Sequence, residues 1–136
     1  MKIIYSFAAV LLVCFALSSC AKKMTFVNSP VVPAATGKVK YKKDDNNNYI
    51  ISVEVENLAA AKNLTPPREL YVVWMESKRN RTRNIGQINT SSGLFSSKLK
   101  GSLKAVSTTT PTSFFITAED NGNVQYPGSQ RVLSTE

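Results

Sequence analysis

The sequence contains no histidine and only two cysteines, Cys14 and Cys20, among its 136 residues. The absence of histidine excludes a Ser-His-Asp triad, a histidine-assisted cysteine nucleophile and every histidine-ligated metal site. For the reasons given below, we expect Cys14 to be removed with a leader segment and Cys20 to be modified. No thiol is then left for a disulfide, a zinc-thiolate site or catalysis. The composition therefore predicts a protein that is not an enzyme and that carries no cofactor.

Acidic residues are also scarce, with 9 Asp and Glu against 17 Lys and Arg, and the formal net charge is +8. A glycosidase needs two carboxylates that face each other across a cleft, and the sequence indicates no such pair. The runs of Asp and Asn at 44–48 and 120–123 lack the spacing of a calcium-binding loop, so we interpret both as turns. We expect no catalytic and no metal-binding residue, and the positive charge favours an anionic partner.

One long hydrophobic run is present, residues 3–17, and it follows the positive charge of Lys2. The run is too short for a stable membrane span and has the length of a signal-peptide core. Residues 17–20, Leu-Ser-Ser-Cys, resemble the lipobox of bacterial lipoproteins, in which an aliphatic and two small residues precede the cysteine. The resemblance implies that residues 1–19 are removed and that Cys20 carries acyl chains that anchor the protein. The alternatives are an ordinary secretory signal with a chance cysteine, or a single membrane anchor.

The residues after Cys20 bear on the location of the protein. Ala21 stands where an Asp, in the enteric lipoprotein pattern, would retain the protein at the inner membrane. Lys22 and Lys23 follow, and no acidic residue that could form a surface-export signal occurs before Asp44. We therefore expect a lipid anchor in the outer membrane, on its periplasmic face, with the two lysines close to anionic headgroups. Export also argues against nucleic acid as a partner.

Prolines and small residues are frequent in residues 20–36, which include Pro30 and Pro33. This composition predicts a flexible, lipidated tether. An alternative for residues 25–27 is a strand that pairs at a sheet edge. We place the folded domain at residues 37–136.

From residue 37 onward, apolar residues recur with a period of two, which is typical of strands that are buried on one face. Short strands with a turn signal about every ten residues predict an all-β fold, an immunoglobulin- or fibronectin-like β-sandwich of about seven strands. We expect Trp74 at the centre of the core, packed against Val53, Leu99 and Ile116. The expected strands are 39–42, 49–56, 69–75, 84–88, 97–104, 113–119 and 131–133.

The second half of the chain carries short motifs in a recognisable order, over about residues 68–133. They are YVVW at 71–74, IG at 85–86, FFITAED at 114–120, a glycine at 122 and YPG at 126–128. This order resembles the extracytoplasmic C-terminal domain of anti-sigma-K factors. The resemblance implies a β-sandwich, in agreement with the strand pattern. The helical sigma-binding domain and the membrane span of those proteins have no counterpart here, so the resemblance implies a shared module and not sigma-factor binding.

One strand, residues 69–75, carries apolar residues on both of its faces. If Leu70, Val72 and Trp74 face the core, Tyr71 and its alternate neighbours face outward. Together with the outward residue of the preceding strand they predict an apolar binding face, because exposed apolar patches often mark interaction sites. The alternative is that the tether or the loop at 59–67 covers this face. The predicted binding face consists of Ile50, Tyr71, Val73 and Met75.

The turn after this strand is strongly basic, with Lys78, Arg79, Arg81 and Arg83 within six residues. We expect a basic hairpin tip that contacts anionic lipid, lipopolysaccharide or an acidic protein surface, and the alternative is a solvated turn without a function. The sequence thus predicts a non-enzymatic, lipid-anchored envelope protein that binds or senses a protein or envelope component. The alternative function is a surface carbohydrate-binding module, which needs exposed coplanar aromatic side chains. The tyrosines available for it are Tyr41, Tyr49, Tyr71 and Tyr126.

Overall fold

The computed structural model describes residues 20–28, 30–79, 81–93 and 97–136, and the predicted leader at 1–19 lies outside these ranges. Nine strands and one short 3₁₀ helix, η2 (Ala61–Asn63), make up the described secondary structure. The helix ends before the Pro66-Pro67 pair, as the sequence indicates. The strands are β1 (Lys22–Asn28), β2 (Thr36–Lys43), β3 (Tyr49–Leu58), β4 (Leu70–Ser77), β5 (Thr82–Gln87), β6 (Asn89–Ser92), β7 (Leu99–Ser107), β8 (Pro111–Glu119) and β9 (Arg131–Thr135).

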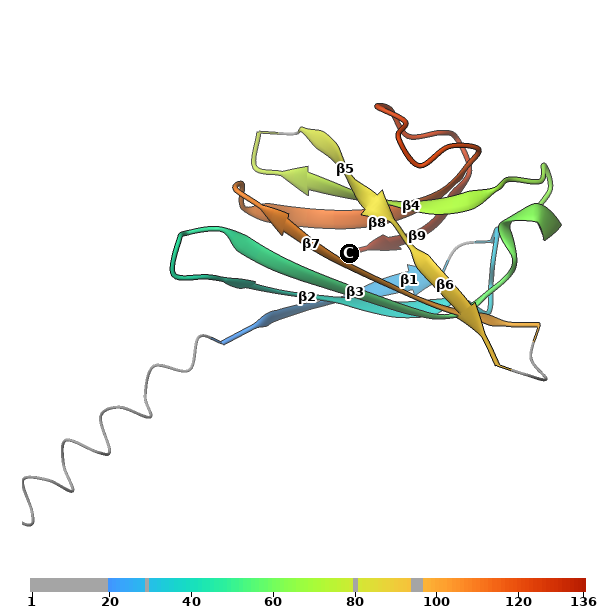
Figure 1. Cartoon of the computed structure of the whole chain (residues 1–136), viewed down its shortest axis with the longest axis horizontal. Coiled ribbons are helices and arrows are strands. Elements are labelled where there is room, and N and C mark those ends of the chain that lie inside the picture. Colours follow the sequence, from blue (N-terminus) through green and yellow to red (C-terminus); the bar gives the residue numbers. More distant parts are fainter. Residues whose placement is uncertain (1–19, 29, 80, 94–96) are drawn as a thin grey trace, which may run out of the picture.

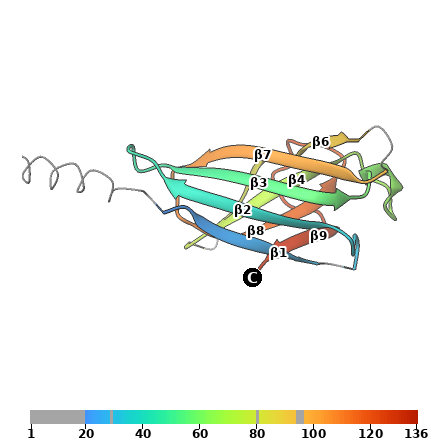
Figure 2. The same ribbon diagram turned by 90° about the horizontal axis from the view of Figure 1, so that it is seen from below.

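The strands form one antiparallel sheet in the order β5-β4-β8-β9-β1-β2-β3-β7-β6. The sheet curls until β4 and β8 lie over β2, β3 and β7, which gives the two layers of a sandwich (Figures 1 and 2). The expected all-β sandwich is therefore confirmed, with nine strands in place of about seven. β5 of one layer approaches β7 of the other at Gly86. This glycine has a φ of 138°, and a Cβ added to it would lie 3.0 Å from the side chain of Leu103 in β7. Glycine permits both this backbone conformation and this close approach.

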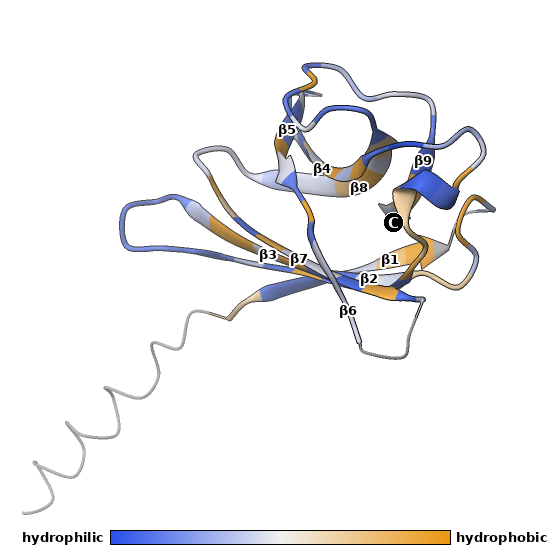
Figure 3. Cartoon of the chain, turned by 45° about the vertical axis from the view of Figure 1, so that its right-hand side comes forward, coloured by the Kyte–Doolittle hydropathy of each residue, from blue (hydrophilic) through white to orange (hydrophobic). Residues whose placement is uncertain are grey.

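The main core fills the space between the two layers, as the hydrophobic strand segments in Figure 3 indicate. The alternation predicted for β3 is confirmed, because Ile51, Val53 and Val55 are buried and Ile50 is exposed. The alternation predicted for β8 is also confirmed, since Phe114 and its alternate neighbours belong to the same core. Burial of these side chains is the main favourable contribution to folding.

The predicted binding face on β4 is wrong. Tyr71, Val73 and Met75 are only 2%, 0% and 1% exposed, and all three belong to the main core. The physical reason is that apolar side chains cover both faces of β4, those of the main core on one side and those of a second, smaller cluster on the other. A strand that is buried on both faces has no polar row that could show which face points inward. Of the predicted face, only Ile50 remains exposed.

Trp74 is fully buried, as predicted, but its predicted neighbours are wrong. It points away from the main core and forms a second cluster with Val72 and Phe115 on the outer side of β4 and β8. The segment 120–130 covers this cluster, and Asn84 of β5 holds the segment by donating hydrogen bonds of 2.9 Å to the carbonyls of Gly122 and Val124. The alternative for the Tyr71 face, cover by the tether or the loop at 59–67, is borne out in part, because Val32, Ala61 and Leu64 belong to the same core cluster as Tyr71.

The predicted tether at 20–36 is also wrong. From Lys22 the chain forms β1, which pairs with both β2 and β9 in the interior of the sheet. Phe26 is buried, and so are Val32 and Ala35 in the connection to β2. The alternative of a strand at 25–27 is confirmed, although β1 does not lie at a sheet edge. β1 is a strand because its neighbours supply partners for its backbone, and β9 comes from the other end of the chain.

Candidate functional site

Several turns meet at the end of the sandwich where β1 begins (Figures 1 and 2), and Cys20 lies two positions before that strand. The strand register places them there. Lys22 at the start of β1 pairs with Tyr41 near the end of β2, and Tyr41 pairs with Ile51 near the start of β3. Ser77 at the end of β4 pairs with Pro111 at the start of β8. We call this the Cys20 end, and it holds Cys20, the turn at 44–48, the turn between β4 and β5, and the loop between β7 and β8.

A groove of about 400 Å³ lies at the Cys20 end. Its cations come from the β4–β5 turn and the start of β5, and its hydroxyl groups come from the β7–β8 loop. The four residues of the predicted basic tip are therefore brought together, and the threonines across from them are residues that the sequence interpretation missed. We call this the basic groove, and it is lined by Met75, Ser77, Lys78, Arg79, Arg81, Arg83, Thr108, Thr109 and Thr110.

The loop that forms the threonine side of the basic groove is held by hydrogen bonds. Ser107 Oγ donates to the Thr109 carbonyl at 3.0 Å and accepts from the Thr109 backbone N–H at 3.1 Å. Thr110 Oγ1 lies 3.0 Å from the Tyr49 hydroxyl of β3. On the opposite side, the Ser77 N–H donates to the Arg81 carbonyl at 3.3 Å across the β4–β5 turn. These hydrogen bonds hold the loop at 107–110 and join Ser77 to Arg81 at the base of the β4–β5 turn.

The cations of the basic groove lack neutralising partners. Within the part of the chain that the structure describes, Lys78, Arg79, Arg81 and Arg83 form no ion pair. Cations elsewhere on the surface do form them, with Lys38 Nζ 3.0 Å from a carboxylate oxygen of Glu54 and Arg68 Nη1 2.7 Å from one of Asp120. Four exposed positive charges that share one groove repel each other, and an anion bound among them relieves this repulsion.

An exposed apolar pair lies beside the basic groove. Ile50 of β3 and Val106 of β7 are paired in register on the outer face of the sheet and are 37% and 66% exposed. Lysines surround the pair, since Lys42 is opposite Ile50 on β2, and Lys40 and Lys104 flank Ser52 in the next row. Ile50 was predicted to share an outer face with Tyr71, Val73 and Met75, and its apolar neighbour in the structure is Val106. The strand predicted at 97–104 ends before Val106. The observed strand β7 continues to Ser107, with buried and exposed side chains in alternation.

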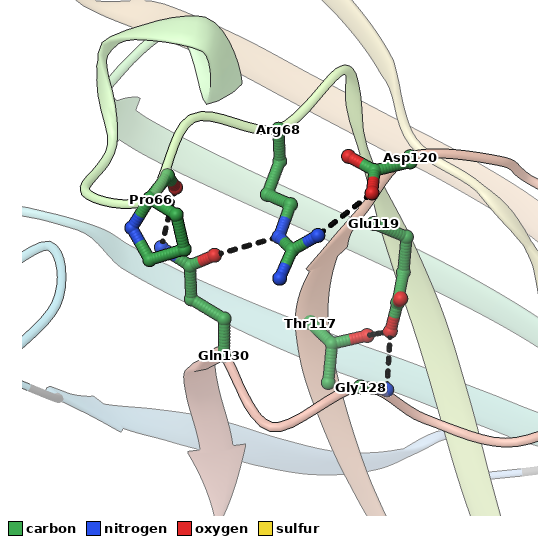
Figure 4. Close-up of polar contacts among 7 residues, drawn as sticks. All are labelled: Pro66, Arg68, Thr117, Glu119, Asp120, Gly128 and Gln130. Atoms are coloured by element: carbon green, nitrogen blue, oxygen red, sulfur yellow. Dashed lines mark hydrogen bonds and ion pairs between the residues drawn. The ribbon is translucent and has the colours of Figure 1, made fainter.

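A second polar group of residues lies at the opposite end, where it fixes segment 120–130 (Figure 4). Arg68 donates to Asp120 at 2.7 Å and to the Gln130 side-chain oxygen at 3.1 Å. The buried Glu119 Oε1 accepts from Thr117 Oγ1 at 2.5 Å and from the Gly128 N–H at 2.7 Å. All of these hydrogen-bond partners belong to the chain itself. The role of this polar group is therefore to hold segment 120–130 in place.

Two groups have shifted pKa values, and neither lies in the basic groove. Burial raises the pKa of Tyr71 to about 12, and its hydroxyl donates to the Ala59 carbonyl at 2.7 Å. Lys38, through a hydrogen bond and its charge, lowers the pKa of Glu54 on the outer face of β3.

The remaining chemical features concern metals and membranes. No three His, Cys, Asp or Glu residues within the described ranges lie close enough together to hold a metal ion. In the same ranges, no helix has the length and apolar character needed to span a membrane. Cys20 is an exposed free cysteine, two positions before the start of β1.

No protein-family model, curated protein or solved structure matches this chain.

Proposed function

We propose that the chain is a non-enzymatic, lipid-anchored protein of the outer membrane that uses the basic groove to bind an anionic component of the cell envelope. Cys20 carries the anchor, after removal of residues 1–19, and faces the periplasm. The anti-sigma-K-like motifs belong in this proposal to a binding or sensing module without a sigma factor.

The basic groove is the observation that carries the proposal. Its cations converge from two elements, remain unpaired within the described residues, and lie opposite three threonine hydroxyls that can donate to anionic oxygens. Arginine guanidinium groups suit carboxylate and phosphate ligands in particular, because they offer several N–H donors in one plane. A solvated turn does not require a second wall of ordered hydroxyl groups.

The alternative function, carbohydrate binding, has less support from the described tyrosines. Tyr41 and Tyr71 are buried, Tyr49 is half-buried, and Tyr126 is 82% exposed. A sugar-binding platform needs several exposed aromatic rings in one plane, and these four do not supply it. A glycan array remains the direct measurement for this alternative.

Retention on a heparin column in a salt gradient tests the anion-binding groove. The acylated protein in detergent is compared with the triple variant Arg79→Gln, Arg81→Gln, Arg83→Gln. We expect the triple variant to elute at clearly lower salt, because bound anions are released as the cations are removed or screened.

The matched control removes the same charge at the opposite end, in Lys62→Gln, Lys98→Gln, Lys100→Gln. This variant should elute close to the wild-type protein. Equal early elution of both triple variants would mean that net charge alone governs retention, and the groove would lose its assigned role.

A further inference from the structure

Almost no chain separates the proposed anchor from the folded sheet. Cys20 and Ala21 precede β1, which begins at Lys22 and already pairs there with Tyr41. Two residues span at most about 7 Å even when fully extended. An acylated Cys20 therefore holds the Cys20 end within a short distance of the headgroups.

The anchor brings two kinds of surface to the membrane, a basic surface at the Cys20 end and an apolar pair near it on the outer face of the sheet. The basic groove and the lysines at the start of β1 and the end of β2 lie at this end. The exposed Ile50 and Val106 lie next to it on the outer face of β3 and β7. Val106 is two residues before the groove residue Thr108, so the apolar pair and the groove lie at the same end of the domain.

The acidic groups near this surface do not cancel its charge. Asp44 is engaged in its own turn, where its Oδ1 accepts from the N–H groups of Asn46 and Asn48 at 2.8 and 2.9 Å. Glu76 accepts a hydrogen bond from Ser113 on the neighbouring strand. Asp45 is exposed on the tip of the turn. Glu136 follows Thr135, which is hydrogen-bonded to Phe114, and is the fourth acidic residue near this end. Eight cations outnumber these four, namely Lys22, Lys23, Lys42, Lys43, Lys78, Arg79, Arg81 and Arg83.

We infer that the anionic ligand of the basic groove is the phosphate of lipid headgroups in the same membrane that holds the acyl anchor. This inference rests on the proposed function, because it needs an acylated Cys20. The domain lies on the membrane with its Cys20 end, the groove cations contact phosphates, and Ile50 and Val106 enter the apolar side of the interface. An amphipathic surface of this kind combines the two forces that hold interfacial proteins on anionic bilayers.

Fluorescence quenching in vesicles tests this orientation. The acylated variant Val106→Trp is reconstituted into vesicles of brominated phosphatidylcholine, with or without phosphatidylglycerol, and the signal of the buried Trp74 is subtracted with the wild-type protein. We expect strong quenching of the new tryptophan when phosphatidylglycerol is present, and less quenching at high salt. Ile50→Trp serves as a second probe if Val106→Trp does not fold.

Two comparisons make the result specific. Tyr126→Trp, on the segment at the opposite end, should not be quenched. Adding Arg79→Gln, Arg81→Gln and Arg83→Gln should abolish the quenching at position 106. Each cation near an anionic surface strengthens attachment about fivefold. Loss of three cations should therefore lower the equilibrium constant for docking by on the order of 100-fold.

The outcomes separate this inference from the proposed function. If the wild-type protein did not float with vesicles, it would have no lipid anchor, and both the proposed function and this inference would be wrong. Flotation with no more quenching at 106 than at 126 would overturn membrane docking and leave the anchored protein intact. If the groove variant then still loses heparin retention, the groove binds an acidic partner away from the membrane, and the present inference is wrong.

Discussion

Trp74 of β4 stacks on Phe115 of β8 with ring centroids 6.1 Å apart and an angle of 14° between the ring planes. The Arg131 guanidinium lies 3.8 Å from the Phe115 ring centroid, a geometry that favours a cation–π interaction. This stack is on the side of the sheet that faces away from the main core. The sandwich therefore has two apolar clusters, and the second one depends on the segment 120–130 that covers it.

Thr117 links the second cluster to that segment, and Thr117→Val should destabilise the protein. Its Oγ1 accepts from Trp74 Nε1 at 2.7 Å and donates to Glu119 at 2.5 Å. The valine leaves a buried N–H without its acceptor and the carboxylate with one donor fewer, at a cost of about 1–3 kcal/mol for each such group. Urea unfolding measures the loss, and Thr112→Val, exposed on the same strand, should change the free energy by less than about 0.5 kcal/mol.

A lysine at Val73 should prevent folding, whereas a lysine at Ile50 should be tolerated. Val73 is fully buried in the main core and Ile50 is 37% exposed, so only the first substitution places an ammonium group in an apolar interior. Circular dichroism and thermal unfolding of the two variants measure the difference. A folded Val73→Lys protein would contradict the assignment of this row to the core.

Phe26→Ala should cost about 3–5 kcal/mol, as for other buried phenylalanines. Phe26 is 4% exposed in the middle of β1, whereas a residue in a flexible tether contributes nothing to stability. Thr25→Ala, at the exposed neighbouring position, is the control. If the two variants had comparable free energies of unfolding in denaturant, residues 20–36 would be a flexible tether after all.

Stability should fall as the pH rises from 10 to about 12, because of Tyr71. Burial raises the pKa of Tyr71 from its ordinary value of 10.0 to about 12, so the folded state keeps a proton that the unfolded state releases. The stabilisation is complete below pH 10 and is lost as the pH passes through 12. Tyr71→Phe removes this group, so the unfolding free energy of the variant should decline less steeply over the same pH range.

Cys20→Ser should abolish fatty-acid incorporation and leave an uncleaved precursor, since the thiol receives the lipid before cleavage of the leader. Metabolic labelling with palmitate and the size of the product on a gel measure both effects. A mature-sized, membrane-bound Cys20→Ser product would contradict the lipoprotein assignment.

Local patterns in the sequence determine much of the secondary structure. The alternation in β3 identifies the buried face of that strand, because side chains of a strand point to opposite sides in turn. The Asp and Asn residues at 44–48 determine the β2–β3 turn, in which Asn47 has a φ of 64°, a conformation that asparagine tolerates. The composition also accounts for the basic turn at 78–83, whose charges need no distant partner to be recognised.

The tertiary structure decides what local patterns leave open. β4 is apolar on both faces, so only the packing against other elements determines that Tyr71 faces the main core and Trp74 the second cluster. β1 becomes a strand because β9, from the far end of the chain, supplies its hydrogen-bond partners. The basic groove likewise needs the β7–β8 loop beside the β4–β5 turn. Such pairings depend on contacts between residues far apart in sequence, and no local period or spacing encodes them.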